Sequence, residues 1–228
     1  MQPTIHTIRL PFPVPYYAQV ASPELAIAIF DEGLDARLDP RWTETGAETA
    51  EEYAYWSGRA CGPACVKMCV EALGGEKRSL MDWVRAGLAR QGYLVEKDQQ
   101  GDPVEVGWLH RALAELIQAA GFRATPQAVA LDDFPHYLKR GCLLIASVSY
   151  QMGQVVQLVT RKGGHLVVVI GVSLLENTLE YIFIDNPSGR SEELRANACI
   201  PVERFRAGYS GRCIVINPKK PHSFERGS

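Results

Sequence analysis

The sequence predicts an α+β protein, with helices in its first half and an antiparallel β-sheet in its second half. Before residue 141, apolar residues recur at the spacing of amphipathic helices, and several of these segments end at glycine. After residue 141, β-branched runs alternate with turns rich in Gly, Pro and Asn, which is typical of strands. Because the two kinds of element are segregated along the chain, α+β is favoured over alternating βα units.

No repeat, low-complexity tract or linker divides the chain. We therefore expect a single domain over residues 1–228, with a helical lobe at about 20–140 and a sheet lobe at about 141–218.

The first half should begin with an extended segment at 8–19, because its prolines exclude a helix. Ser22 should cap a short helix that reaches Phe30, and Thr49 should begin a helix that reaches Trp56. The remaining expected elements are helices at 61–73, 80–90 and 108–120, a polar loop at 94–107, a strand at 122–130 and a short helix from 131 to near 141.

The second half should be built from four strands. They are expected at 142–148, 165–172, 179–185 and 211–216, with turns at 163–164 and 186–189 and a helical turn at 202–205.

The composition is that of an ordinary soluble protein, with 46% apolar and 22% charged residues. The net charge of −2 and the lack of a basic patch argue against a nucleic-acid partner. No apolar run is long enough to insert into a membrane, and no signal peptide is visible, so we expect a cytoplasmic protein. Nothing in the sequence indicates the oligomeric state.

The six cysteines do not form a disulfide framework. Cys61, Cys65 and Cys69 share one face of a helix, and Cys142 lies in a strand-like run, which is typical of reduced cysteines. Their spacing fits no zinc or iron–sulfur site, so we expect neither a metal nor another cofactor.

Cys61 is the candidate nucleophile. It begins a helix with Gly62 and Pro63 in its first turn, and the helix is apolar except for Lys67 and Glu71 on one face. The N–H groups and the dipole at a helix N-terminus favour a thiolate, so a lowered pKa is expected for Cys61. The alternative is an ordinary core cysteine.

His165 is the candidate base, since it opens an apolar strand directly after a Gly-Gly turn. If the strands 165–172 and 179–185 are neighbours, His165 lies beside Asp185 and Asn186. Because side chains alternate along a strand, only one of these two can face the imidazole. The alternatives are a core histidine and plain turn residues; His110 is expected at an exposed helix position.

Three segments carry a family resemblance: Arg-Ala-Cys-Gly-Pro-Ala-Cys-Val-Lys-Met at 59–68, Gly-Gly-His-Leu-Val-Val-Val-Ile-Gly at 163–171 and Ile-Phe-Ile-Asp-Asn-Pro-Ser-Gly at 182–189. They resemble the nucleophile, histidine and third-residue motifs of the bacteriocin-processing (double-glycine leader) peptidases, over roughly residues 14 to 216. The resemblance implies a papain-like fold, in which a helical lobe with the nucleophile packs on a sheet lobe with the histidine.

The resemblance also implies roles for residues. Cys61 corresponds to the nucleophile and His165 to the general base, and alignment without a gap slightly favours Asn186 over Asp185 as the third residue. The family usually has a glutamine shortly before the nucleophile as oxyanion donor, but residues 52–56 contain none. Gln19, in Val-Pro-Tyr-Tyr-Ala-Gln, is the remaining candidate, with a structural role as its alternative.

The function implied is that of a cysteine peptidase acting on a peptide or peptide-like acyl substrate through a thioester. An acyltransferase or amide-forming enzyme would use the same Cys-His chemistry with an amine in place of water. A binding protein on an inactive peptidase scaffold is the third hypothesis.

Overall fold

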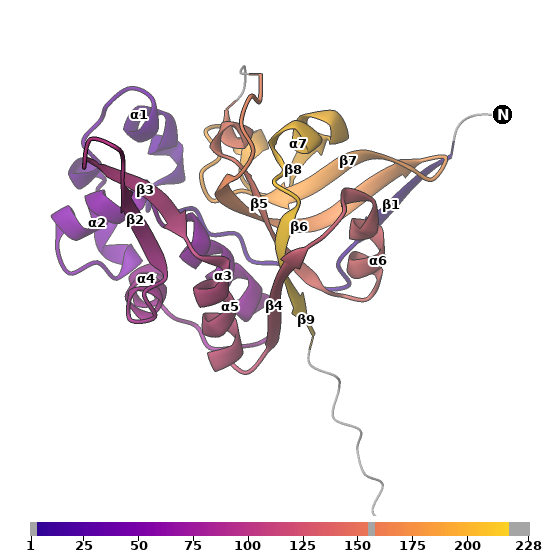
Figure 1. Ribbon diagram of the computed structural model, residues 1–228, viewed down its shortest axis with the longest axis horizontal. Helices are drawn as coiled ribbons and strands as arrows, with labels where there is room; N and C mark the ends of the chain where they lie inside the picture. Colours follow the sequence, from indigo (N-terminus) through magenta and orange to yellow (C-terminus); the bar gives the residue numbers. More distant parts are fainter. Residues whose placement is uncertain (1–3, 155–157, 219–228) are drawn as a thin grey trace, which may run out of the picture.

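The computed structural model describes residues 4–154 and 158–218. Its centre is an antiparallel sheet in the order β4-β9-β5-β6-β7-β8, with β1 also paired to β6 (Figure 1). The strands are β1 (Ile5–Arg9), β4 (Arg123–Ala128), β5 (Leu143–Ser149), β6 (Gly164–Leu175), β7 (Thr178–Asp185), β8 (Ala198–Pro201) and β9 (Arg212–Asn217).

The helices α1 to α5 gather on one side of this sheet in Figure 1, so the predicted α+β class is confirmed. Among them, α3 packs on β6 and α5 packs on β4, which joins the two parts of the molecule. These helices are α1 (Ala26–Phe30), α2 (Ala50–Ser57), α3 (Cys61–Ala72), α4 (Leu80–Leu88) and α5 (His110–Ala119), with 3-10 turns at Pro23–Leu25, Ala36–Leu38 and Trp42–Thr45.

Two short helices lie on the sheet side of the molecule. α6 (Phe134–Lys139) packs against β1 and β6, and α7 (Val202–Gly208) packs against β7 and β8. Three further 3-10 turns lie at Leu131–Asp133, Tyr150–Gly153 and Glu192–Leu194. Because β4 and α6 belong with the sheet, the helical part ends near residue 122, earlier than the sequence predicted.

Helix α3 is the centre of the core. Its residues from Gly62 to Val66 and from Met68 to Val70 are buried. These include Cys65 and Cys69, which therefore serve packing. Its polar side chains pair with each other, since Lys67 Nζ lies 2.5 Å from Glu71 Oε1. The pairing explains how a nearly buried helix carries two charges.

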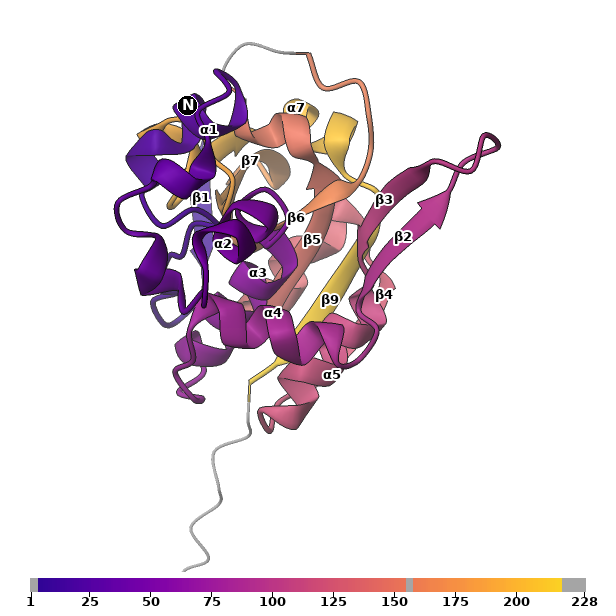
Figure 2. The ribbon, with the colours of Figure 1, turned by 90° about the vertical axis from the view of Figure 1, so that its left-hand side faces the viewer.

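The expected polar loop at 94–107 is wrong, because this segment is a hairpin of β2 (Tyr93–Lys97) and β3 (Pro103–Trp108). Figure 2 shows the hairpin projecting from the body beside α4 and α5. Both of its faces are largely solvent-exposed, and the polar run at 96–102 between its apolar segments favoured a loop.

Ser22 does not cap a helix through its side chain. Its hydroxyl instead donates to Asp39 Oδ1 at 2.7 Å, and a 3-10 turn precedes α1. By contrast, Thr49 does cap α2, and Ser79 forms a capping box with Asp82 at the start of α4.

None of the helices in residues 4–154 and 158–218 combines the length and the hydrophobicity that a membrane crossing needs.

Candidate active site

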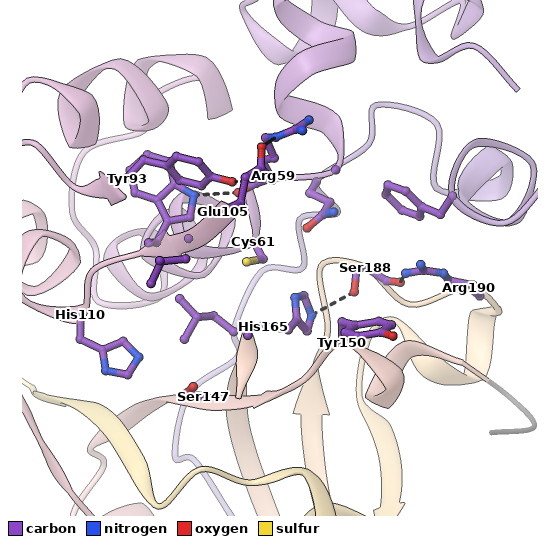
Figure 3. Close-up of a pocket in the computed structure, with 18 residues that line it drawn as sticks. Arg59, Cys61, Tyr93, Glu105, His110, Ser147, Tyr150, His165, Ser188 and Arg190 are labelled. Carbon is purple, nitrogen blue, oxygen red and sulfur yellow. Dashed lines mark hydrogen bonds and ion pairs between the residues drawn. The ribbon is translucent and has the colours of Figure 1, made fainter. Parts of the chain in front are cut away.

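A cleft of about 400 Å³ lies between the helical part and the sheet, and both parts contribute to its walls (Figure 3). Cys61 reaches it from the start of α3, and His165 reaches it from the start of β6. In Figure 3 the Cys61 sulfur and the His165 ring are directed into the same space. The structure thus brings together two side chains that lie far apart in the sequence.

The start of α3 is held in place by Trp108 at the end of β3. The Trp108 Nε1–H donates to the carbonyl of Arg59 at 2.7 Å, two residues before Cys61. A Cβ at position 62 would lie 2.9 Å from Trp108 Cγ, so glycine is required there for the indole to pack against the helix. These contacts hold the first turn of α3 against the end of β3.

Burial raises the pKa of the Cys61 thiol to about 11, although the backbone N–H groups of Leu166, Gly62 and Cys61 itself act in the opposite direction. The sequence-based expectation of a lowered pKa therefore has the wrong direction. The amides at the helix start are present as expected, but the loss of water around the sulfur outweighs them.

His165 is 5% exposed and is oriented by an amide. Its Nε2 lies 2.8 Å from Asn186 Oδ1, and the same oxygen accepts the Ser188 backbone N–H at 3.1 Å. Since a backbone N–H can only donate, the atom facing it is the amide oxygen, and His165 Nε2 must carry the hydrogen. The lone pair is then on Nδ1.

Burial also lowers the pKa of His165 to about 4. The hydrogen bond to Asn186 raises the pKa, and the positive charge of Arg190 lowers it further. Because burial shifts both groups toward their uncharged forms, the resting cleft contains a thiol and a neutral imidazole at neutral pH.

Asp185 does not meet His165. Its side chain, 3% exposed, accepts the Asn197 backbone N–H at 2.8 Å. Burial raises the pKa of Asp185 to about 6. Strand β7 pairs with β6 as expected and ends at Asp185, and the next residue, Asn186, lies across the imidazole.

Ser188 is a site residue that sequence reasoning missed. Its Oγ lies 2.9 Å from His165 Nε2 and 3.3 Å from Asn186 Oδ1. The sequence did contain one signal for it. Ser188 lies two residues after Asn186 in a tight turn, where a serine hydroxyl can hydrogen-bond to other groups of the same turn.

Gln19 lines the cleft and is 3% exposed. Within the described residues its Oε1 is buried without a hydrogen-bond partner. Its backbone N–H donates to the carbonyl of Pro187 at 2.9 Å, and the Tyr16 hydroxyl donates to the carbonyl of Asn186 at 3.0 Å. The segment 16–22, which we call the strap, therefore rests on the turn that orients His165.

The far end of the strap is anchored by a buried carboxylate. The Ser22 N–H donates to Asp39 Oδ2 at 3.0 Å, and the Ala21 N–H donates to the Tyr53 hydroxyl at 3.0 Å. The Tyr53 hydroxyl in turn donates to Asp39, which is fully buried. Gln19 is thus positioned from both sides.

In the part of the chain that the structure describes, no group of three or more His, Cys, Asp and Glu side chains is placed to hold a metal ion.

No family model matches the chain, and no curated protein matches it by sequence. Among solved structures, the peptidase domain of Streptococcus ComA, a bifunctional ABC transporter involved in a quorum-sensing pathway, is similar with 17% identity and a TM-score of 0.47. The similarity covers 71% of this chain and 93% of that domain.

Two further structures are similar. A double-glycine-motif protease from an AMS/PCAT transporter, in complex with the leader peptide, has 17% identity and a TM-score of 0.41, covering 69% of this chain and 84% of that chain. PepW from Lactobacillus rhamnosis has 10% identity and a TM-score of 0.29, covering 74% of this chain and 55% of that chain.

Proposed function

We propose that the protein is a cysteine peptidase that cleaves a peptide bond through a thioester acyl-enzyme. Cys61 is the nucleophile, His165 the general base and acid, and Asn186 the residue that orients His165. The observation that carries the proposal is the 2.8 Å contact between His165 Nε2 and Asn186 Oδ1. This contact leaves Nδ1 unprotonated in the cleft that the Cys61 thiol enters.

The reaction follows from this protonation state. As the Cys61 sulfur attacks the substrate carbonyl carbon, its proton passes to His165 Nδ1. The imidazolium then gives that proton to the leaving nitrogen as the C–N bond breaks, and a thioester remains. A water molecule, deprotonated by His165, hydrolyses the thioester and releases the acid and the free thiol.

Gln19 and the N-terminus of α3 are the proposed oxyanion donors. The Gln19 side chain lines the same cleft as Cys61, and the strap positions it. The α3 N-terminus adds backbone N–H groups beside the sulfur. Removing one such donor lowers kcat by about 10²- to 10³-fold in known cases, so Gln19→Ala should be severely impaired.

We also place the protein in the cytoplasm. All six cysteines are free, and four of them are buried in the core, which suits a reducing compartment.

Product analysis tests the proposed function. The purified chain is incubated with a peptide mixture, with and without an added primary amine, and the products are identified by mass spectrometry. We expect hydrolysis that is lost in Cys61→Ala and retained in Cys199→Ala, in which an exposed cysteine far from α3 is replaced. Amide products in place of acids would instead indicate an acyltransferase, and peptide binding without turnover would indicate a binding protein.

A further inference from the structure

One end of the cleft contains polar groups that the proposed chemistry does not use. His110, the first residue of α5, and Ser147, on β5, both line the cleft. Ser147 is the strand neighbour of Leu166, which also lines the cleft, so both side chains belong to the same face of the sheet. In Figure 3 they lie on the opposite side of Cys61 from Ser188 and Arg190.

Neither side chain has a hydrogen-bond partner within residues 4–154 and 158–218. Ser147 is 9% exposed and His110 is half-buried, so both have lost much of their contact with water. The other charged residues of the cleft are paired: Arg59 Nε lies 2.6 Å from Glu105, and Arg190 Nε lies 3.2 Å from Asp31. Because no side chain of the described residues occupies their hydrogen-bonding groups, both side chains are free to bind a polar group of the substrate.

A cationic residue lies near this end of the cleft. Arg212, the first residue of β9, comes directly before Cys213, which pairs with Ala146, the residue before Ser147. Burial lowers the pKa of His110, and the nearby charge of Arg212, at the start of β9, lowers it further. Arg212 is exposed and has no ion-pair partner among the described residues. A neutral imidazole and a hydroxyl offer one hydrogen-bond donor each, and the charge of the nearby Arg212 favours an anionic acceptor.

The direction of the substrate follows from the proposed function, on which this inference rests. The leaving nitrogen must take its proton from His165, so it lies on the His165 side of the thiol. The acyl part then extends toward His110 and Ser147 (Figure 3).

We propose that His110 and Ser147, with Arg212 next to Ser147 in the sheet, form a subsite for a carboxylate side chain in the acyl part of the substrate. The subsite selects Asp or Glu over an uncharged or basic residue. A carboxylate here would accept from the Ser147 hydroxyl and from one His110 nitrogen.

The test uses acyl peptides with a fluorogenic amine as leaving group, in which each of four acyl positions carries Glu, Gln, Leu or Lys in turn. At one position we expect Glu to exceed Gln and Leu by roughly tenfold in kcat/KM, the effect of a hydrogen bond to a charged group. Ser147→Ala and His110→Ala should bring that ratio toward one. His136→Ala, at an exposed histidine on α6, is the matched control and should leave it unchanged.

The same peptides made as acyloxymethyl ketones separate this inference from the proposed function. They alkylate Cys61 without hydrolysis, and intact mass gives the rate. Faster labelling by the Glu peptide without turnover of any amide would keep the subsite and reject the peptidase. Equal labelling rates for all four residues, no labelling, or a Glu preference that survives in both variants would overturn the subsite.

Discussion

The contact between His165 and Asn186 predicts that Asn186→Ala lowers kcat/KM. Asn186→Ala removes the acceptor of the Nε2–H in a place where His165 is 5% and Asn186 is 0% exposed, so water cannot readily replace it. Leaving a buried donor without its acceptor costs about 1 to 3 kcal/mol. If the transition state loses this free energy, kcat/KM falls by roughly 5- to 150-fold. Because Ser188 Oγ stays 2.9 Å from the same nitrogen, we expect the lower part of this range, about tenfold.

Asp185→Ala is the matched comparison, since it changes the adjacent residue at the end of the same strand. Its carboxylate accepts the Asn197 N–H and does not contact His165. The variant should lower the free energy of unfolding by about 0.5 to 1.5 kcal/mol, because it removes a partly buried hydrogen bond. It should change kcat/KM by less than about twofold.

The pH dependence separates the two residues further. His165 accepts the thiol proton only when it is unprotonated, and burial lowers its pKa to about 4, so activity should fall as the pH drops toward 4. A carboxylate at position 186 stabilises the imidazolium, so in Asn186→Asp this fall should occur at higher pH. In Asn186→Ala it should occur at lower pH, since the Asn186 hydrogen bond raises the pKa.

The assay is kcat/KM against pH on the peptide cleaved in the product analysis, with urea denaturation of each variant. If Asp185→Ala and Asn186→Ala reduce turnover equally, or if Asn186→Asp leaves the pH profile unmoved, Asn186 does not orient His165.

Three further predictions concern buried charges. Burial raises the pKa of Asp185 from 3.8 to about 6, so the stability that its protonation contributes is present below pH 4 and is lost as the pH rises through 6. In urea denaturation, the difference in unfolding free energy between pH 4 and pH 7 should therefore shrink by up to roughly 3 kcal/mol in Asp185→Asn. Glu71→Gln leaves Lys67, 12% exposed, without its counter-ion and should lower the unfolding free energy by about 3 kcal/mol, against less than about 1 for Glu76→Gln in the exposed pair with Arg78; equal effects would contradict this. Asp39→Asn should lower both stability and kcat by loosening the strap, whereas Asp35→Asn, in an exposed pair, should lower neither; an Asp39 variant with full kcat would show that the strap does not position Gln19.

Much of the fold could be predicted because the hydrophobic pattern and the capping residues of a segment agreed with where that segment lies in the folded protein. The apolar run after Cys61 and the β-branched run after His165 are both buried, and Thr49 and Ser79 cap the helices that follow them. The hairpin of β2 and β3 was missed for the opposite reason. Val104, Glu105 and Val106 alternate as in a strand, but this signal is short, and the polar run at 96–102 beside it favoured a loop.

Electrostatics at the site could be predicted only in part. The position of Cys61 at a helix start is local and was visible in the sequence. The burial of the sulfur depends on residues such as Leu166 and Trp108, which line the same cleft from other elements, and the spacing of residues along the sequence does not show it. The sign of the pKa shift was wrong because a long-range desolvation effect exceeded a local dipole effect.

The strap shows why Gln19 could be proposed but not placed from sequence. Gln19 and Cys61 are separated by the segment that forms α1 and α2, so no periodicity relates them. Their proximity depends on two contacts of high sequence separation, from Tyr16 to Asn186 and from Gln19 to Pro187. Because these contacts reach the same turn that holds His165, the proposed oxyanion donor and the residue that orients the base share one support. Movement of that turn should therefore affect both at once.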